Sequence, residues 1–546
     1  MELRSRVGQA LRSPVTFALL AAFAWVAVYN RRFWSETLAT MPSFSPADIA
    51  FLVSVFALLW ALHAALLLLF PTRPLLKAVS AFLFVAASVG AYFADTYGVS
   101  IDSETIRNLF ETDKREAIGL FTLRSVFYVS VLGLAPAVLI MRMHVAKLSM
   151  KQHLLQRAAF LAAFAVLVAV SFASLSAHYA SFLREHKSVR YLVTPANIVY
   201  ATSAYVGDTN LAPGDSRLVE LEAPVRRIAA ASPTKPLLMF LVIGETARSQ
   251  NFQLGGYARP TNPELSRRNV QYFSNVSSCG TSTAISLPCM FSGLGRAAFD
   301  VVRAQRNTNL LDALASAGFR VQWRDNNSGC KGICARVENI DYTLHGDDKL
   351  CTKSGCYDEV MLKGLAQELA AVDRDTVIVF HQAGSHGPAY SERYPKSFET
   401  FTPACQGNEL SRCKVEHVVN AYDNSIVYTD YNLARQIDLL RASSAAADSI
   451  LIYVSDHGES LGERGMYLHG APFMVAPAEQ TRVPFVLWMS EGYRKRFAVS
   501  EACLGAKKQG AFSHDHLYHS VLGALGVSTA RYQAAMDMFH ECRSGL

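Results

Sequence analysis

Five long apolar segments in the first 180 residues constrain this chain more than any other feature. They cover residues 16–28, 49–70, 76–92, 117–140 and 158–177. Most of them approach the roughly 20 residues that a helix needs to cross a hydrocarbon layer about 30 Å thick. The first segment follows several arginines, as in a secretory signal, but no small-residue cleavage site precedes Arg31 and four more segments follow. The pattern therefore predicts five membrane-spanning helices.

Basic residues flank alternate ends of these segments, which predicts how the chain is oriented in the membrane. They are Arg4, Arg6 and Arg12 before the first span, Arg73 and Lys77 between the second and third, and Arg142, Lys147, Lys151 and Arg157 between the fourth and fifth. Loops rich in Lys and Arg stay on the cytoplasmic side. We therefore expect a cytoplasmic N-terminus, a membrane domain over residues 1–180, and everything after it outside the cytoplasm.

The cysteines support that topology independently. All ten lie after residue 278, and an even number in one part of the chain indicates disulfides formed in an oxidising compartment. Neighbours in sequence make plausible pairs: Cys279 with Cys289, Cys330 with Cys334, Cys351 with Cys356, Cys405 with Cys413, and Cys503 with Cys542. A zinc site built from the second and third of these pairs is the alternative. It is less favoured because its spacings do not match the common two-residue zinc knuckle.

The charge distribution argues against a nucleic-acid partner. The first 180 residues carry 15 Lys and Arg against 9 Asp and Glu, whereas the rest carry 37 against 36. The larger part of the chain is thus nearly neutral, without a basic stretch interleaved with aromatic residues. Nucleic-acid binding needs clustered cations to neutralise phosphates, so we expect no nucleic acid among the partners.

Beyond the membrane segments, residues 181–234 contain several prolines and read as a bridge, and a catalytic domain is expected over residues 235–546. Apolar runs that predict buried strands cover 236–244, 319–323, 376–381, 450–455 and 483–489. Helical patterns cover 308–317, 357–372, 415–441 and 516–525. This alternation predicts an α/β domain with a mostly parallel central sheet covered on both faces.

Polar residues follow four of the predicted strands at the point where each strand ends. They are Glu245, then Asp325, Asn326 and Asn327, then His381 and His386, and finally Asp456 and His457. Sites in open α/β sheets gather beyond the carboxyl ends of the strands. Carboxylate and imidazole ligands together suit zinc. An Asp–His hydrogen bond in a tight turn is the alternative for residues 456–457 alone, and the acidic residue at another strand end weakens it.

The segment 278–289 offers a nucleophile beside that metal site. Its glycine and hydroxyl residues are typical of a helix N-terminus, where backbone N–H groups and the helix dipole attract a phosphate. A hydroxyl coordinated to zinc would become a competent nucleophile. The residue types alone do not choose among Thr281, Ser282 and Thr283.

Six short motifs, at residues 244–248, 279–283, 326–332, 384–388, 455–460 and 468–470, together resemble one family. They are similar to the phosphoethanolamine transferases of Gram-negative bacteria, particularly the lipid A enzymes that include the mobile colistin-resistance proteins. The resemblance covers the whole chain. It implies five spans in the bacterial inner membrane and a periplasmic domain of the alkaline-phosphatase and sulfatase-like fold.

The resemblance also implies a role for each motif residue. Glu245, Thr283, Asp456 and His457 would hold the catalytic zinc, and Thr283 would accept the phosphoethanolamine group. His386 and His469 would bind the substrate phosphate or a second zinc, so that one or two zinc ions are expected. Asn327 and Lys331 would hold the phosphoethanolamine moiety, and Asn108, Thr112 and Glu116 in the loop before the fourth span would contact lipid.

The function implied is a zinc-dependent transfer of phosphoethanolamine from phosphatidylethanolamine to a lipid A phosphate, through a covalent threonine intermediate. Inner-membrane lipids would surround the spans, and lowered polymyxin and colistin susceptibility would follow. One alternative is a sister transferase acting on core lipopolysaccharide sugars or glucans. Others are a membrane-tethered zinc phosphodiesterase or sulfatase, and a membrane receptor or lipid-binding protein with an inactive hydrolase domain.

Overall fold

The chain forms two compact units in the computed structural model. The model describes residues 13–41, 44–111, 120–210, 218–220, 222–228, 235–343, 349–352 and 354–544. One unit contains residues 1–106 and 121–205, and the other contains residues 107–120 and 206–546. We refer to them as the membrane unit and the catalytic unit.

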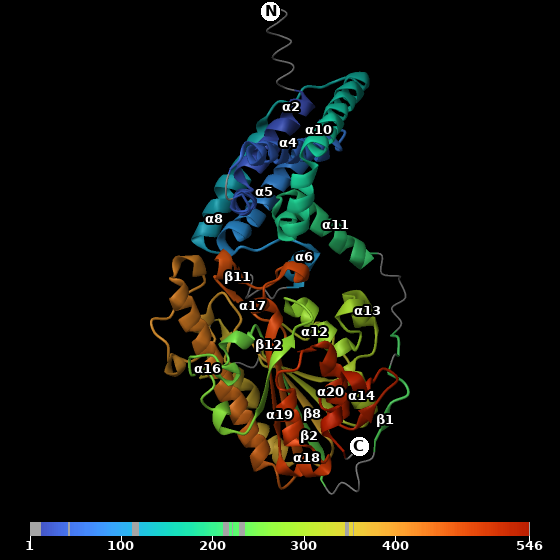
Figure 1. The fold of residues 1–546 in the computed structure, drawn as a ribbon, viewed down its shortest axis with the longest axis vertical. Helices are drawn as coiled ribbons and strands as arrows, with labels where there is room; N and C mark the ends of the chain where they lie inside the picture. Colours follow the sequence, from blue (N-terminus) through green and yellow to red (C-terminus); the bar gives the residue numbers. More distant parts are fainter. Residues whose placement is uncertain are drawn as a thin grey trace, which may run out of the picture. The chain divides into compact units, whose positions relative to one another are not determined.

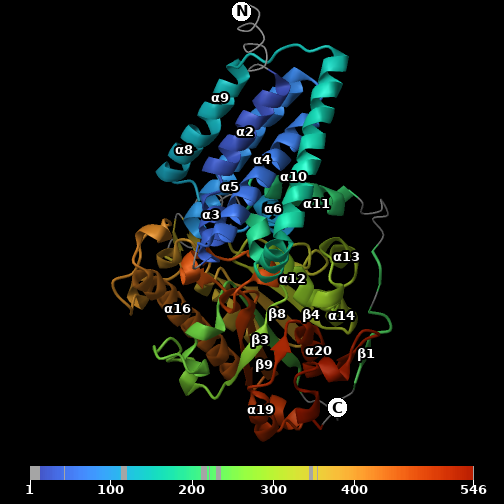
Figure 2. The ribbon, with the colours of Figure 1, turned by 45° about the horizontal axis from the view of Figure 1, so that its top comes forward.

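The membrane unit is built from helices, of which the long ones lie alongside one another (Figure 2); the last residues of α11 belong to the other unit. They are α2 (Pro14–Val28), α3 (Arg31–Ala39), α4 (Pro46–Leu68), α5 (Arg73–Tyr97), α8 (Leu123–Val129), α9 (Ala135–Arg142), α10 (Met150–Glu185) and α11 (Ala196–Asn210). Within the described residues, four spans are long and apolar enough to cross a membrane. A fifth is reached if α2 and α3, which are bent by 57° from each other, form one span.

Hydroxyl residues define where these helices begin. Ser45 caps α4 in a reciprocal capping box with Asp48, and Ser149 caps α10 in the same way with Gln152.

The bend between α2 and α3 is held by Asn30, whose amide donates to the Trp25 and Thr194 carbonyls and accepts from the Thr194 N–H. Asn30 therefore ties the end of α2 to residue 194 at the point where the chain bends.

The fourth span begins at Leu123 in the described residues and contains a π-helical turn (Ser130–Leu134) between α8 and α9. Pro136 follows this turn and cannot donate a backbone hydrogen bond, which accounts for the local widening. A Cβ on Gly133 would lie 2.4 Å from Ser88 Oγ, so only glycine allows this turn to pack against α5.

The catalytic unit contains an eight-stranded sheet in the order β13-β3-β12-β9-β2-β8-β4-β5. The strands are β2 (Leu237–Gly244), β3 (Gln271–Ser277), β4 (Arg320–Asp325), β5 (Glu338–Asp341), β8 (Thr376–His381), β9 (Asp448–Ser455), β12 (Arg482–Met489) and β13 (Phe512–Ser513). Strand β12 is antiparallel to both of its neighbours, and all other pairs are parallel. The expected mostly parallel sheet is confirmed.

Alternate residues of the central strand β2 point into two separate cores. Leu237, Met239, Leu241 and Ile243 pack in a core with α12 (Thr283–Ser292), α14 (Leu310–Ser316) and α20 (Asp515–Ala524). Leu238, Phe240 and Val242 pack in a second core with α15 (Leu365–Ala370) and α16 (Val415–Ala442). Figure 1 shows α16 on one side of the strands and α14 and α20 on the other. A sheet buried on both faces needs strands that are apolar throughout, as β2 is.

One expected helix is split in the structure. Residues 357–372 form a 3₁₀ turn (Asp358–Leu362) followed by the short helix α15. Gly364 separates them with a φ of +73°, a left-handed conformation that ends the first turn. The prediction of one continuous helix was therefore wrong at this point.

All ten cysteines are paired in the catalytic unit, between the neighbours in sequence that the spacing suggested: Cys279–Cys289, Cys330–Cys334, Cys351–Cys356, Cys405–Cys413 and Cys503–Cys542. Cysteines that are locked in disulfides cannot act as thiolate ligands. The alternative of a four-cysteine zinc site does not apply to this structure.

Candidate functional site

The parallel register brings four strand ends to one edge of the sheet. Gly244 of β2 is paired with Ser455 of β9, and Ile243 is paired with His381 of β8. Asp325 of β4 is paired with the same His381. Backbone hydrogen bonds continue this register past the strands, because Asp456 N–H donates to the Gly244 carbonyl at 2.9 Å. Residues that follow β2 and β9, 211 positions apart in the chain, therefore lie side by side.

Three residues at this edge form a buried cluster with the composition of a metal site. Glu245, Asp456 and His457 are at most 1% exposed, and each offers one ligand atom within 4.8 Å of the others. Each carboxylate uses one oxygen in hydrogen bonds, while Glu245 Oε1 and Asp456 Oδ2 have no hydrogen-bond partner among the described residues. Two orphaned, buried carboxylate oxygens are costly unless a cation lies between them.

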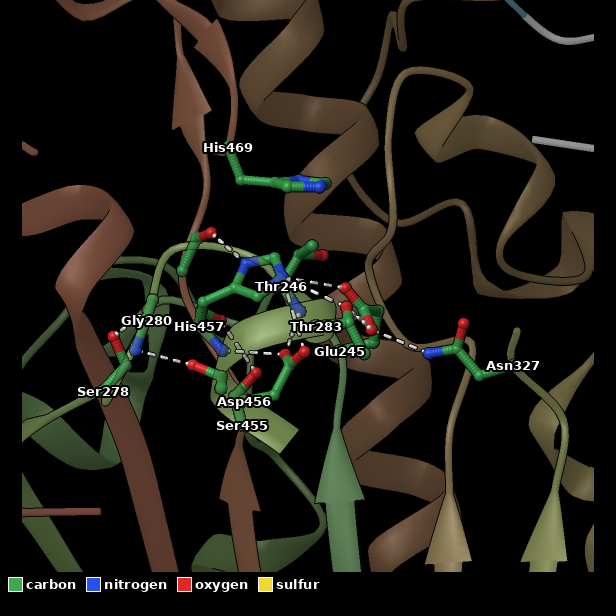
Figure 3. A network of polar contacts seen from close by, with 12 residues as sticks. Glu245, Thr246, Ser278, Gly280, Thr283, Asn327, Ser455, Asp456, His457 and His469 are labelled. Carbon is green, nitrogen blue, oxygen red and sulfur yellow. Dashed lines mark hydrogen bonds and ion pairs between the residues drawn. The ribbon is translucent and has the colours of Figure 1, made fainter. Parts of the chain in front are cut away.

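The orientation of His457 supports the same conclusion. Its Nδ1 lies 2.9 Å from the Gly458 carbonyl, which can only accept, so Nδ1 carries a proton. Nε2 then faces Glu245 Oε1 at 3.3 Å, Asp456 Oδ2 at 3.4 Å and the Thr283 hydroxyl at 3.4 Å. Figure 3 shows these groups converging from separate segments. A ring nitrogen surrounded by oxygen donors, with its other nitrogen bonded to a carbonyl, is the usual arrangement of a metal-ligating histidine.

The electrostatics of the cluster require more positive charge than one imidazole supplies. Burial alone would lower the pKa of His457, but the Asp456 and Glu245 carboxylates outweigh it and raise the pKa to about 10. Burial and the charge of Glu245 raise the pKa of Asp456 to about 6. Both shifts arise because two buried carboxylates share one cation. A divalent ion would satisfy both, and the mixed oxygen and nitrogen donors fit zinc.

Thr283 is the hydroxyl that faces this cluster. It is the first residue of α12, and its Oγ1 donates to Glu245 Oε2 at 3.0 Å. The hydroxyl of Thr281 instead donates to the Ala471 carbonyl at 2.7 Å, which ties it to the neighbouring loop. The Ser282 hydroxyl has no hydrogen-bond partner in the part of the chain that the structure describes. Among the three candidates from sequence, geometry therefore favours Thr283 as the nucleophile.

The loop before α12 is fixed on several sides. The Cys279–Cys289 disulfide ties it to the helix, and Gly280 N–H donates to Ser286 Oγ at 2.8 Å. The buried His514 joins the loop to strand β9. Its Nδ1 accepts from Cys279 N–H at 3.1 Å, and its Nε2 lies 2.9 Å from the Ser455 carbonyl. The hydroxyl and the metal-ligand candidates are thus held on one framework.

Asn327, expected to bind substrate, lies against the cluster. Its Nδ2 donates to Glu245 Oε2 at 2.7 Å and to the Gln382 carbonyl at 2.9 Å. The same amide lies 3.3 Å from His381 Nε2, while His381 Nδ1 lies 3.1 Å from Asp325 Oδ2. A buried chain of contacts from Asp325 through His381 to Asn327 therefore orients the carboxylate of Glu245.

His386 and His469 lie beside each other, with ring centroids 5.2 Å apart, and His469 lies 4.4 Å from the His457 ring. His469 Nδ1 is 3.2 Å from Oε2 of the fully buried Glu459. A histidine that donates Nδ1–H to a carboxylate presents Nε2 for a metal or a phosphate oxygen. The structure therefore brings both histidines together with the cluster.

Lys331 and Asn108 are the remaining described residues that were expected to contact substrate or lipid. Lys331 has a φ of +50°, and its ammonium donates to the carbonyl and hydroxyl of Ser328 at 3.1 Å each. Asn108 lies on α6 (Ser103–Glu111), and residues 107–120 belong to the catalytic unit. Thr112 and Glu116 lie outside the described residues.

Two residues with contacts to the site were absent from the sequence-based set. Glu459 lies two positions after His457, within the motif at residues 455–460, so its carboxylate could have been considered. His514 lies 59 residues from Ser455 and 235 from Cys279, in a segment without a recognisable motif. Only the folded structure reveals that it connects them.

Comparison with known proteins shows which family this chain is similar to. The family model described as phosphoethanolamine transferase EptA/EptB matches residues 59–209, and the sulfatase model matches residues 238–527. The chain is 36% identical to phosphoethanolamine transferase EptA of Escherichia coli K12 over 539 residues, covering 97% of each protein. It is 37% identical to phosphatidylethanolamine transferase Mcr-1 of Escherichia coli, covering 87% of this chain and 90% of Mcr-1.

Among solved structures, the integral membrane lipooligosaccharide phosphoethanolamine transferase A of Neisseria meningitidis superposes with a TM-score of 0.92. The two proteins are 32% identical, and the match covers 97% of this chain and 99% of that one. The similarity therefore extends over both units.

Proposed function

Because the chain belongs to the phosphoethanolamine transferase EptA/EptB family, we propose that it transfers phosphoethanolamine from phosphatidylethanolamine to a phosphate of lipid A. The catalytic domain, residues 235–546, works in the periplasm beside the inner membrane and is anchored by residues 1–180 through the bridge 181–234. The observation that carries this proposal is the Thr283 hydroxyl facing the cluster of Glu245, Asp456 and His457.

Glu245, Asp456, His457 and Thr283 are the residues that would hold a zinc ion. When bound, zinc would lower the pKa of the hydroxyl and stabilise negative charge on the substrate phosphate. The donor set supports this assignment, because two carboxylate oxygens in the cluster have no hydrogen-bond partner among the described residues and His457 Nε2 faces them. One ion accounts for these four residues, and His386 and His469 either bind phosphate or hold a second ion.

The residues of this chain divide the reaction into two steps. In the first, Thr283 Oγ1 attacks phosphorus with Glu245 Oε2 in place to accept the hydroxyl proton at 3.0 Å. The Oγ1–phosphorus bond forms, the bond from phosphorus to the glycerol oxygen breaks, and diacylglycerol leaves with a proton. In the second, a lipid A phosphate oxygen attacks the phosphorus of the phosphoethanolamine–threonine, the Oγ1–phosphorus bond breaks, and the proton of the attacking phosphate passes to Oγ1 and restores the Thr283 hydroxyl.

His386, His469, Asn327 and Lys331 are proposed to position the phosphoethanolamine group. An imidazole N–H and an ammonium are good donors to phosphate oxygens. His469 is preset for this role by Glu459, and Asn327 is held beside the site by its bonds to Glu245 and Gln382. Asn108, Thr112 and Glu116 remain proposed lipid contacts, supported by the similarity to the lipid A transferases.

The product adds an ammonium group to lipid A. A surface that carries fewer net negative charges attracts cationic peptides less strongly. We therefore propose that expression of this protein lowers polymyxin and colistin susceptibility.

The test uses phosphatidylethanolamine labelled in its head group, incubated with purified full-length protein and lipid A. Label on lipid A supports the transferase, whereas label released to water indicates a phosphodiesterase, and no turnover indicates a binding protein. The Thr283→Ala variant should transfer no label and should carry no phosphoethanolamine on peptide 281–292 by mass spectrometry.

Thr281→Ala is the matched control, because its hydroxyl bonds to the Ala471 carbonyl and not to the cluster. It should retain transfer within a few-fold of wild type. Equal labelling of lipid A by wild type and Thr283→Ala would show that the nucleophile is another residue.

A further inference from the structure

The membrane unit contains a cavity of about 540 Å³. This volume falls within the range of small-molecule sites, roughly 300–1,000 Å³. Its walls come from α4 and α10 and from the segment after α10, and every residue lining it belongs to the membrane unit.

The two ends of this cavity differ in chemistry. Its apolar part is lined by Val55, Leu58, Leu59 and Leu62 of α4 and by Phe172, Phe182 and Leu183 of α10. Its other end is lined by His186, Arg190, Tyr191, Asn197 and Tyr200, which follow α10. Such an arrangement suits an amphipathic ligand whose tail is apolar and whose head is polar.

The apolar part of the cavity extends at least as deep as one leaflet of a bilayer. Helix α4 enters the membrane at Pro46 from the periplasmic side, and Val55 and Leu62 lie 9 and 16 residues along it. At 1.5 Å per residue these positions are about 14 Å and 24 Å from the outer end of the helix. Val55 therefore lies near the middle of a hydrocarbon layer about 30 Å thick, and Leu62 lies beyond it, so the apolar part is deep enough for an acyl chain.

The charge of the polar end selects among head groups. The segment 184–190 contains Arg184, Lys187 and Arg190 against Glu185 alone, although it lies on the periplasmic side, where basic residues are disfavoured. The described residues that line the cavity include no Asp or Glu. The ammonium of a zwitterionic head group would be repelled by this basic segment. A head group whose only charge is its phosphate would be attracted to it.

Arg190 is held at this end in a geometry suited to phosphate. Its guanidinium lies over the Tyr191 ring, 4.7 Å from the centroid, and Nη2 donates to the Tyr191 hydroxyl at 2.7 Å. That bond uses one of the five N–H donors of a guanidinium, and a planar fork binds phosphate oxygens in pairs.

We propose that this cavity binds an anionic glycerophospholipid of the periplasmic leaflet, with one acyl chain between α4 and α10 and the phosphate at Arg190. Phosphatidylglycerol has this chemistry. The ligand thus differs from the zwitterionic donor, and the lining residues all belong to the membrane unit and are not among those proposed to act in transfer. Its test measures binding alone, so its failure would leave the proposed transferase activity unaffected.

The experiment places full-length protein in nanodiscs that contain equal amounts of phosphatidylglycerol and phosphatidylethanolamine. In one sample only the first lipid carries a photoreactive acyl chain, and in the other only the second does. After irradiation, cross-linked peptides are mapped by mass spectrometry. Residues 55–62 and 172–183 should be labelled by phosphatidylglycerol at least three-fold more than by phosphatidylethanolamine.

Three variants test the two halves of the site. Arg190→Ala should reduce the phosphatidylglycerol labelling at least three-fold, and Leu59→Trp should do the same by filling the apolar part. Ala196→Phe fills the cavity from another wall if Leu59→Trp fails to fold. Leu161→Trp, on an exposed face of α10 and outside the cavity, is the control that should keep the labelling.

Two results would overturn the proposal. The first is equal labelling of these segments by both lipids in the wild-type protein, which would mean that the cavity does not select an anionic head group. The second is unchanged labelling in Arg190→Ala together with unchanged labelling in a folded cavity-filling variant.

Discussion

Substituting Gly384 with alanine should displace the metal-ligand candidate Glu245 by crowding it from the neighbouring loop. Gly384 has a φ of +52°, and a Cβ built on it would lie 2.6 Å from the Glu245 carbonyl oxygen and 2.9 Å from the Glu245 nitrogen. The loop cannot easily retreat, because the buried Asp358 carboxylate accepts from Ala383 N–H and Gly384 N–H. The displacement should therefore fall on Glu245.

The size of the effect follows from these distances. Real Cβ atoms essentially never approach a heavy atom closer than 3.0 Å, so Glu245 must move by at least about 0.4 Å. Catalytic groups must be held within roughly 0.5 Å, and a 1 Å error costs about 100-fold in rate. We expect kcat/KM for transfer to fall about 10-fold or more, which corresponds to about 1.4 kcal/mol in transition-state stabilisation.

Gly407→Ala separates this contact from backbone strain. Gly407 is also left-handed, with a φ of +84°, but a Cβ there meets nothing within 4 Å. Both variants should lose about 1–2 kcal/mol of stability from the left-handed conformation. Transfer kinetics, bound zinc and thermal unfolding are measured on full-length protein in detergent. The reasoning is refuted if Gly384→Ala equals Gly407→Ala in kcat/KM and in zinc content.

Three further predictions rest on the same site. Glu459→Ala should lower kcat/KM about 10–100-fold, because His469 would lose the carboxylate that orients it. Glu459→Gln keeps a hydrogen-bond acceptor and should retain most of the activity. Equal losses of kcat/KM in both variants, with unchanged melting temperatures, would argue that Glu459 does not position His469. Burial lowers the pKa of His514 to about 3, whereas an unfolded histidine has a pKa of roughly 6.5. As the pH falls, the unfolded state therefore takes up a proton before the folded state does. The free energy of unfolding should fall by up to about 5 kcal/mol between pH 6.5 and pH 3. Scanning fluorimetry across this range should show the loss, and His514→Gln should flatten that part of the profile. Removing the metal with a chelator should abolish transfer and lower the melting temperature. Added zinc should restore both better than added magnesium, because the ligand candidates include an imidazole. Full activity in a metal-free sample would contradict the zinc assignment.

The sequence predicted the helices and strands correctly where burial in the core requires a clear pattern of apolar residues. Strand β8 occupies the expected residues 376–381, and helix α16 covers the expected 415–441 with one residue more. These elements are long, and their apolar residues follow one period clearly. Strands β3, β5 and β13 were not predicted, because they are short or carry polar residues near the edges of the sheet. An edge strand buries fewer side chains, so its sequence carries less signal.

The site was predictable from the sequence to the extent that parallel strands share an edge. Glu245, Asp456 and His457 follow directly after strands, so the order of residues along the chain was enough to infer their proximity. The choice of Thr283 over Thr281 needed the resemblance, because the residues are chemically identical and differ only in what their hydroxyls meet. The link made by His514 depends on tertiary packing alone.

The level register of the central strands also limits how this enzyme can diversify. Adding or removing one residue within β2 or β9 would carry a ligand about 3.3 Å along the strand and turn it to the opposite face of the sheet. The residue pairs between β2 and β9, which run from Leu237–Asp448 to Gly244–Ser455, would also be shifted out of register. Insertions and deletions are therefore confined to the connecting loops, and new acceptor specificities must evolve there, around a scaffold that cannot shift.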